Sequence, residues 1–306
     1  MADNDVQKVL NKMSGNSDVL TKKYYDSLAI EMRIIDSGLS DISYDFLGHK
    51  LPMPIMMGVV GGFHHLGEDA NYKAALAAKQ LDTIYWTSSH ISDEELKRLI
   101  DSGCKVGIVI KPFKDMDFFL ERCRRAEELG VTAIASDIDH AYNKNGEYDG
   151  QQGEVFAPRT SEELKRIVKA LKVPFIAKGV LSIHDALACK EAGVSGIILS
   201  HHHNIMSFAV PPVMILPDIR KAVGEDYPVF VDCGIVSAAE AFKAIALGAD
   251  CVLVARPYMA PLAKEGTEGV VEFFTKMKGE FREFMNRTGS KDLKHIDPTV
   301  IHHMPC

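Results

Sequence analysis

The feature of this sequence that most constrains its fold is an eightfold alternation of short apolar runs with amphipathic stretches, which begins at residue 53. The runs are rich in Val and Ile and do not alternate with polar residues, as is typical of strands buried on both faces of a parallel sheet. Eight such strands, most of them followed by a helix, predict a (β/α)8 barrel. The runs cover residues 53–60, 83–87, 105–110, 132–138, 174–177, 196–199, 228–231 and 251–254.

Helix-start signals between these runs support the same architecture. In each signal, a Ser or Thr that can cap a helix is followed within three positions by an acidic residue. These signals occur at Ser92, Thr160, Ser182 and Ser237. The alternative fold is an open doubly wound sheet, but no Gly-x-Gly-x-x-Gly follows the first predicted strand.

The barrel prediction divides the chain into two parts. We expect a short, mostly helical N-terminal segment over residues 1–52 and the barrel over residues 53–306. The polar, Gly-rich segment 141–158 follows the fourth strand and is predicted to be a long active-site loop. A charged amphipathic helix is expected over residues 265–287.

Composition disfavours several classes of function. The 306 residues carry 35 Lys and Arg against 42 Asp and Glu, a net charge of -7, whereas nucleic-acid binding depends on clustered basic residues. No run approaches the roughly 20 apolar residues of a membrane span. The polar N-terminus has no apolar run behind it, so we expect no secretory signal. The six cysteines form no Cys-x-x-Cys pair, which indicates free thiols and a cytoplasmic protein.

Histidines gather where the predicted strands end. Seven of the 12 histidines follow directly after a strand, and the carboxyl ends of the strands form the active-site rim of this fold. Asp139 could orient a histidine there as a general base. Lys178 ends a buried strand and could form a Schiff base or stabilise an anion. A three-histidine metal site is conceivable, but adjacent side chains of an extended chain alternate in direction, and we expect no metal.

The last two strands end in residues suited to an anion. Asp232 and Gly234 precede a helix start, and Arg256 follows the next strand. The loops after the seventh and eighth strands are the usual phosphate site of this fold. Gly234 suits such a site, because a backbone without a Cβ can approach the ligand closely.

Three stretches of the sequence resemble the FMN-dependent α-hydroxy-acid oxidases and dehydrogenases. The first begins at Lys178 with KGVLSIHDAL and continues to ILSHH. The second contains VFVDCGI, AFKAIALGAD and VARP, and the third is RTGSKDLKHI. The resemblance extends over residues 46–296 and is more specific in the second half.

The resemblance implies FMN as the cofactor and a role for each matching residue. His202 matches the histidine that takes a proton from the substrate, and Asp139 matches the aspartate that orients it. Lys178 matches the lysine that stabilises the reduced flavin. A homotetramer is implied in the same way. The residues that match the family's cofactor contacts, or fall where its backbone meets the flavin, are Val60, Gly61, Ser88, Lys178, Ser200, Asp232, Gly234 and Arg256.

The departures from the family pattern fall mainly on substrate recognition, and some fall on residues near the flavin. Ile205 stands where the family has an arginine that binds the substrate carboxylate, and a second such arginine aligns near Gly146. Lys111 replaces a tyrosine and Asp137 a threonine. Because a lysine does not reproduce the bidentate geometry of an arginine, the substrate is not expected to be a simple 2-hydroxy acid held in the usual way. The candidate substrate-binding residues are Lys111, His140, His201 and His90.

These observations predict an FMN-dependent oxidoreductase that acts on a small-molecule substrate. It would oxidise an alcohol carbon next to an activating group, in a substrate similar to a 2-hydroxy acid but held in an atypical pocket, while His202 takes a proton and hydride passes to the flavin. Two alternatives remain: an FMN-dependent isomerase, and a metal-dependent or Schiff-base lyase on the same barrel. A non-catalytic scaffold is disfavoured, because His202, Asp139 and Lys178 are all present.

Overall fold

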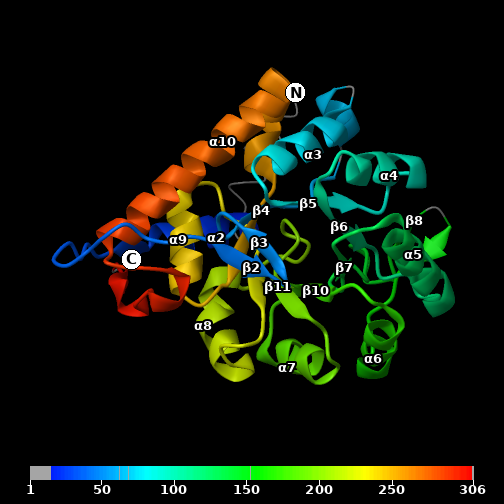
Figure 1. Cartoon of the computed structure of the whole chain (residues 1–306). Coiled ribbons are helices and arrows are strands. Elements are labelled where there is room, and N and C mark those ends of the chain that lie inside the picture. Colours follow the sequence, from blue (N-terminus) through cyan, green and yellow to red (C-terminus); the bar gives the residue numbers. More distant parts are fainter. Residues whose placement is uncertain (1–14, 62, 68, 152, 305–306) are drawn as a thin grey trace, which may run out of the picture.

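Eight parallel strands form a closed barrel, as the sequence predicts (Figure 1). The computed structural model describes residues 15–61, 63–67, 69–151 and 153–304. Every predicted apolar run coincides with one strand, although β5 and β10 extend past the predicted ends, and pairing of the last strand with the first closes the barrel. The strands are β4 (Ile55–Met57), β5 (Ile84–Ser88), β6 (Lys105–Ile110), β7 (Ala133–Asp137), β10 (Phe175–Val180), β11 (Gly196–Leu199), β12 (Val229–Val231) and β13 (Cys251–Val254).

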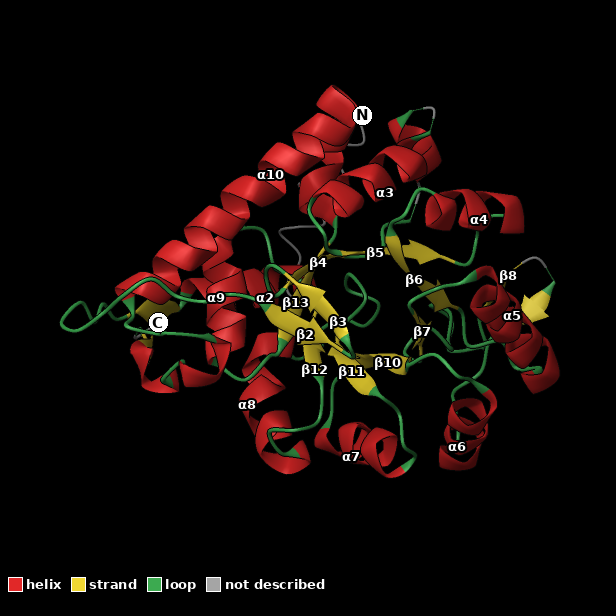
Figure 2. Ribbon diagram, viewed as in Figure 1, coloured by secondary structure: helices red, strands yellow, loops and turns green. Residues whose placement is uncertain are grey.

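Helices surround the barrel, and the predicted caps begin several of them (Figure 2). Side chains of Ser92, Thr160, Ser182 and Ser237 each accept a backbone N–H of the helix that follows, and Thr160 and Ser237 form complete capping boxes. None of the helices in the described part of the chain is long and apolar enough to span a membrane. The helices are α3 (Ala70–Gln80), α4 (Asp93–Asp101), α5 (Met116–Leu129), α6 (Ser161–Ala170), α7 (Ile183–Glu191), α8 (Pro212–Val223), α9 (Ala238–Ala246) and α10 (Met259–Arg287).

The C-terminal helix and the Gly-rich segment 141–158 differ from the prediction in local details. The expected C-terminal helix is α10, which bends at Gly266, where φ is 63° and ψ is -138°. The Gly-rich segment 141–158 contains a small antiparallel hairpin of β8 (Gly150–Gln151) and β9 (Glu154–Val155).

The described part of the N-terminal segment is less helical than expected. It contains the helix α2 (Ser17–Asp26), but also the strands β1 (Leu28–Ile30), β2 (Tyr44–Phe46) and β3 (His49–Leu51). Strand β1 pairs with β14 (Ile301–His303), a partner far along the chain that a local pattern cannot reveal. The expectation of a mostly helical segment therefore holds only for α2.

Phe46 and Leu51 of the β2–β3 hairpin pack against the buried side chains of the barrel strands. The Phe46 ring lies 6.3 Å from Trp86 and 5.3 Å from Phe230, centroid to centroid. A Cβ on Gly107 would lie 2.5 Å from the Trp86 ring, so only glycine fits beside this indole. Because the interior is packed with side chains, the space for chemistry lies at the carboxyl ends of the strands.

Candidate active site

The centre of the candidate site is a buried carboxylate that two ammonium groups share. Asp137 is the last residue of β7, and Lys178 lies opposite it in the parallel register of β10. Lys178 Nζ donates to Asp137 Oδ1 over 3.0 Å, and Lys111 Nζ, directly after β6, donates to Oδ2 over 2.7 Å. The side chains of Lys178 and Asp137 are only 3% and 4% exposed. Water therefore screens these charges weakly.

Charge pairing outweighs burial in this network. Burial disfavours the ionised form of Asp137, but Lys178, Lys111 and His202 hold the pKa of its carboxyl far below the usual value. Burial likewise opposes the charge of Lys178, yet Asp137 and Asp232 raise the pKa of its amine above the usual value. Both groups are therefore ionised at neutral pH, and Lys178 is a fixed cation.

His202 and Asp139 form the pair that the resemblance implies. His202 Nδ1 lies 3.3 Å from Asp139 Oδ1 and 3.6 Å from Asp137 Oδ1. Gly179 makes room for Asp139: its φ is +97°, and a Cβ there would lie 2.3 Å from Asp139 Cγ. The second oxygen of this carboxylate, Oδ2, is buried and has no hydrogen-bond partner among the described residues.

A second imidazole–carboxylate pair faces the first. His140 Nε2 lies 2.9 Å from Asp149 Oδ2, and His140 Nδ1 lies 2.9 Å from Lys111 Nζ. Burial, and then the charges of Lys111 and His202, lower the pKa of His140. The ring is therefore neutral at neutral pH, so that Nε2–H donates to Asp149 and Nδ1 accepts from Lys111. The His140 and His202 rings meet edge to face with centroids 5.0 Å apart.

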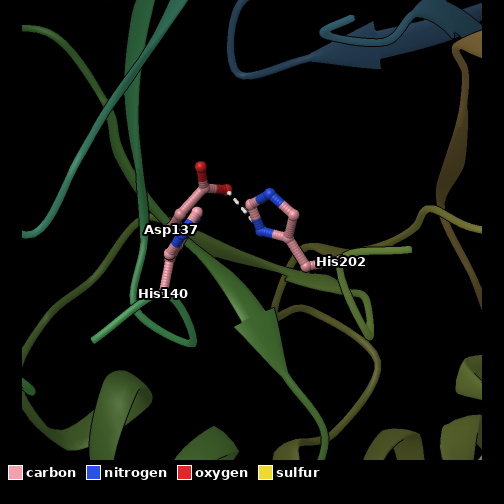
Figure 3. Close-up of side chains that lie close together, drawn as sticks. All are labelled: Asp137, His140 and His202. Carbon is pink, nitrogen blue, oxygen red and sulfur yellow. Dashed lines mark ion pairs between the residues drawn. The ribbon is translucent and has the colours of Figure 1, made fainter. Parts of the chain in front are cut away.

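Figure 3 shows Asp137, His140 and His202 close together, with an ion pair between Asp137 and His202. One ligand atom of each lies within 4.8 Å of the others, and imidazoles with a carboxylate can bind a transition metal. However, the ammonium of Lys111 already donates to both Asp137 and His140. A metal ion on these three residues would have to displace that ammonium, so the arrangement favours proton transfer and substrate binding.

Arg256 belongs to the predicted anion site, and helix α2 lies against it. Arg256 Nη1 and Nη2 each lie 3.3 Å from a carboxylate oxygen of Asp18, which His203 also contacts. Burial would raise the pKa of Asp18, but the hydrogen bond to His203 and the charge of Arg256 lower it to about 2. Gly234 has a φ of +77°, and a Cβ there would lie 2.6 Å from Thr21 of α2. The guanidinium therefore already holds an anionic group of its own chain.

The other predicted cofactor contacts lie on either side of this network. Ser200 Oγ donates to Asp232 Oδ2 over 3.5 Å, and Asp232 Oδ2 lies 3.7 Å from Lys178 Nζ. Val60 and Ser88 line a cavity of about 890 Å³ at the ends of β4 and β5. The structure thus joins Ser200, Asp232 and Lys178 directly and places the first two strand ends beside open space.

Two of the predicted substrate-binding histidines lie away from the His202 cluster. We expected His201 in the site, but its side chain is buried and its Nε2 lies 2.8 Å from Thr21 Oγ1 of α2. His90 is exposed, contacts Gln151 over 2.6 Å and lines the cavity beside β5. Adjacent residues of a loop point in different directions, so only some of the rim histidines converge. Lys111 and His140 do lie with His202.

Three acidic residues of the site were not among the predicted site residues, and one of them, Asp137, was noted only as a departure from the family pattern. Asp149 lies in the Gly-rich segment predicted to be an active-site loop, so that segment was the signal that could have identified it. Asp18 carries no comparable signal, because it is separated from Arg256 by 238 residues and meets it only in the folded chain.

A closed (β/α)8 barrel with a buried lysine and a histidine–aspartate pair at the carboxyl ends of its strands has the features of a cofactor-dependent enzyme. The description "FMN-dependent dehydrogenase" belongs to a family model that matches residues 9–163 and 153–303. The chain belongs to this family and is an FMN-dependent oxidoreductase.

Similar proteins agree with this assignment. The peroxisomal (S)-2-hydroxyacid oxidase GLO3 of Arabidopsis thaliana is 28% identical over 300 residues, which cover 86% of this chain and 81% of the relative. Human 2-hydroxyacid oxidase 1 is 27% identical over 306 residues, with 87% and 82% covered. A crystal structure of mandelate oxidase superposes with a TM-score of 0.84 at 25% identity and covers 95% of this chain and 90% of the other.

The residues present fit FMN. Lys178 is a buried fixed cation suited to a flavin that gains negative charge, and Asp232 lies beside it. Arg256 holds the carboxylate of Asp18 as it would hold the oxygens of a phosphate. Gly234 presents a backbone without a Cβ at the same rim. Lys178 and Asp232 would therefore hold the flavin end, and Arg256 and Gly234 the phosphate end.

Proposed function

We propose that this protein oxidises an alcohol carbon next to an activating group, with His202 as the base. The observation that carries the proposal is the contact of His202 Nδ1 with Asp139, 3.3 Å away, beside the fixed cation Lys178. When bound, FMN supplies the acceptor for the hydride of the substrate. The chain itself supplies the base, the orientation of the substrate and the charge that stabilises the reduced cofactor.

The proton chemistry follows from the tautomer of His202. A carboxylate at Nδ1 accepts the Nδ1–H, so the lone pair of the ring lies on Nε2. Nε2 takes the hydroxyl proton of the substrate, and Asp139 stabilises the imidazolium that results. Lys178 offsets the negative charge that accumulates on the cofactor side of the site.

Lys111 and His140 bind the substrate in this proposal. Asp137 and His140 hold the ammonium of Lys111 over 2.7 and 2.9 Å, and Asp149 fixes the ring of His140. Lys111 therefore cannot leave this position without breaking two hydrogen bonds. This rigidity suits a group that orients a reacting oxygen.

The test compares His202→Ala with a matched surface variant. We expect His202→Ala to purify with bound FMN but to lose anaerobic reduction of the flavin by substrate, followed by absorbance near 450 nm. His184→Ala should reduce at the normal rate, because His184 is 89% exposed and contacts only its neighbour Asp185 in the described structure. Full reduction by His202→Ala would refute the role of His202.

The same experiment separates the alternative reactions. Conversion of substrate without bleaching of the flavin would point to an isomerase. Trapping of a substrate on Lys178 by borohydride would point to a Schiff-base lyase. The lyase is disfavoured because Asp137 and Asp232 raise the pKa of the Lys178 amine and keep it protonated, whereas an attacking amine must be neutral.

We also propose that the protein is a cytoplasmic homo-oligomer. Four large apolar side chains are exposed on the loop between β1 and β2, at Met32, Ile34, Ile35 and Leu39. This loop extends away from the barrel (Figure 1), as suits a contact with a second copy of the chain. A double change of Ile35 and Leu39 to Asp should reduce the mass measured by light scattering. The described cysteines are free thiols, which fits a reducing compartment.

A further inference from the structure

The network around Asp137 carries an excess of negative charge. Two ammonium groups, on Lys111 and Lys178, face four carboxylates linked by hydrogen bonds or ion pairs to the lysines and the two histidines. The two lysines and the four aspartates of this network sum to a net charge of -2. The carboxylates belong to Asp137, Asp139, Asp149 and Asp232.

Within the described structure, each cation of this network already has a carboxylate partner. Asp137 accepts hydrogen bonds from both lysines, and Lys178 also lies 3.7 Å from Asp232. The guanidinium of Arg256 is held by Asp18 at the anion site. A substrate carboxylate would add negative charge where solvent screens poorly, and like charges repel strongly there.

An uncharged carbonyl group avoids this repulsion and still finds a donor. The ammonium of Lys111 has three N–H bonds, and within the described structure it uses two of them, on Asp137 and His140. The third can donate to a carbonyl oxygen. A carbonyl next to the alcohol carbon also activates the C–H bond by withdrawing electrons, without bringing a charge.

We infer that the substrate is an uncharged 2-hydroxy carbonyl compound, an amide or an ester, and not a 2-hydroxy carboxylate. The inference rests on the proposed function. The hydroxyl proton would pass to His202 Nε2, and FMN, when bound, would supply the acceptor for the hydride of the same carbon. The C–O bond becomes C=O, and the product is a 2-oxo amide or ester.

The experiment compares isosteric substrates that differ in charge. Glycolamide is tested against glycolate, and lactamide against lactate, by anaerobic reduction of the flavin in the holoenzyme. We expect kcat/KM for each amide to exceed that of its acid by about 100-fold, since a charge–charge repulsion at several Å in a poorly screened site is of that order. An acid that reacts as fast as its amide, or faster, would overturn the inference.

Asp149→Asn tests whether the charge of the network sets this preference. The amide oxygen of Asn can still accept from His140 Nε2, while one negative charge is removed. The ratio of kcat/KM for the amide to kcat/KM for the acid should fall by about tenfold in this variant. Asp185→Asn is the matched control, because Asp185 lies 3.0 Å from His184 on the exposed face of α7. It should leave the ratio unchanged, and an unchanged ratio in Asp149→Asn would contradict the charge argument.

A binding measurement keeps this inference separate from the proposed function. Acetamide and acetate cannot be oxidised in this reaction, and their binding is followed by the change in the flavin spectrum of the holoenzyme. Tighter binding of acetamide than of acetate would support the inference even if no alcohol reduced the flavin. Failure of every alcohol to reduce the flavin would refute the proposed function alone. Tighter binding of acetate would overturn the inference whichever alcohols react.

Discussion

Asp137→Asn is the change that most directly tests the charge network. Removal of one partner of a buried ion pair costs about 3–5 kcal/mol, because a charge remains without compensation. Lys178 keeps Asp232 at 3.7 Å, and Lys111 keeps His140 at 2.9 Å. We therefore expect the lower end of the range, about 3 kcal/mol, which lowers the Tm of a chain of this length by about 5 °C.

The assay is thermal unfolding followed by circular dichroism, with an exposed ion pair as the control. Asp101 contacts Lys97 within α4, and these two side chains are 58% and 51% exposed. Asp101→Asn should cost at most about 1 kcal/mol, because solvent screens such a pair. If Asp137→Asn and Asp101→Asn melt at the same temperature, the reasoning about the buried network is refuted.

The pH dependence of this difference has a definite sign. The pKa of Asp137 in the folded protein lies well below its usual value, because Lys178, Lys111 and His202 outweigh the effect of burial. The contribution is therefore fully present above the unfolded pKa of about 4 and is lost as the pH falls further. The difference in Tm between wild type and Asp137→Asn should be constant from pH 8 to pH 5 and shrink below about pH 4. A difference that grows on acidification would contradict the assignment.

Two further substitutions test the neighbouring contacts. Gly179→Ala should displace Asp139, because φ at residue 179 is +97° and the new Cβ would lie 2.3 Å from the carboxyl carbon of Asp139. We expect the substrate to reduce the flavin more slowly in this variant, at an unchanged FMN content. Asp18→Asn should tighten binding of FMN to the apoprotein about fivefold, since this carboxylate competes for Arg256 and a partly exposed ion pair is worth up to about 1 kcal/mol. Riboflavin, which lacks the phosphate, should bind equally well to the wild type and to Asp18→Asn in a fluorescence titration. Weaker binding of FMN to Asp18→Asn than to the wild type would mean that Asp18 instead orients Arg256.

Local sequence determined the barrel and its rim. Each strand could be predicted because a short run rich in apolar residues, without polar alternation, indicates burial on both faces of a sheet, and this pattern is local in the sequence. The caps at Thr160 and Ser237 are local for the same reason. In a parallel barrel the carboxyl ends of the strands all lie at one end. The sequence could therefore place Lys111, Lys178 and His202 at the same rim before the structure was known.

Tertiary structure alone decided which charges meet. The register between β7 and β10 sets Asp137 opposite Lys178, and a shift of one residue would turn the side chain to the other face. Helix α2 brings Asp18 to Arg256 across 238 residues, and β1 finds its partner at the other end of the chain. Such contacts follow from the packing of the whole molecule, in which many weak interactions are satisfied together. A local pattern of residue types therefore cannot predict these long-range contacts.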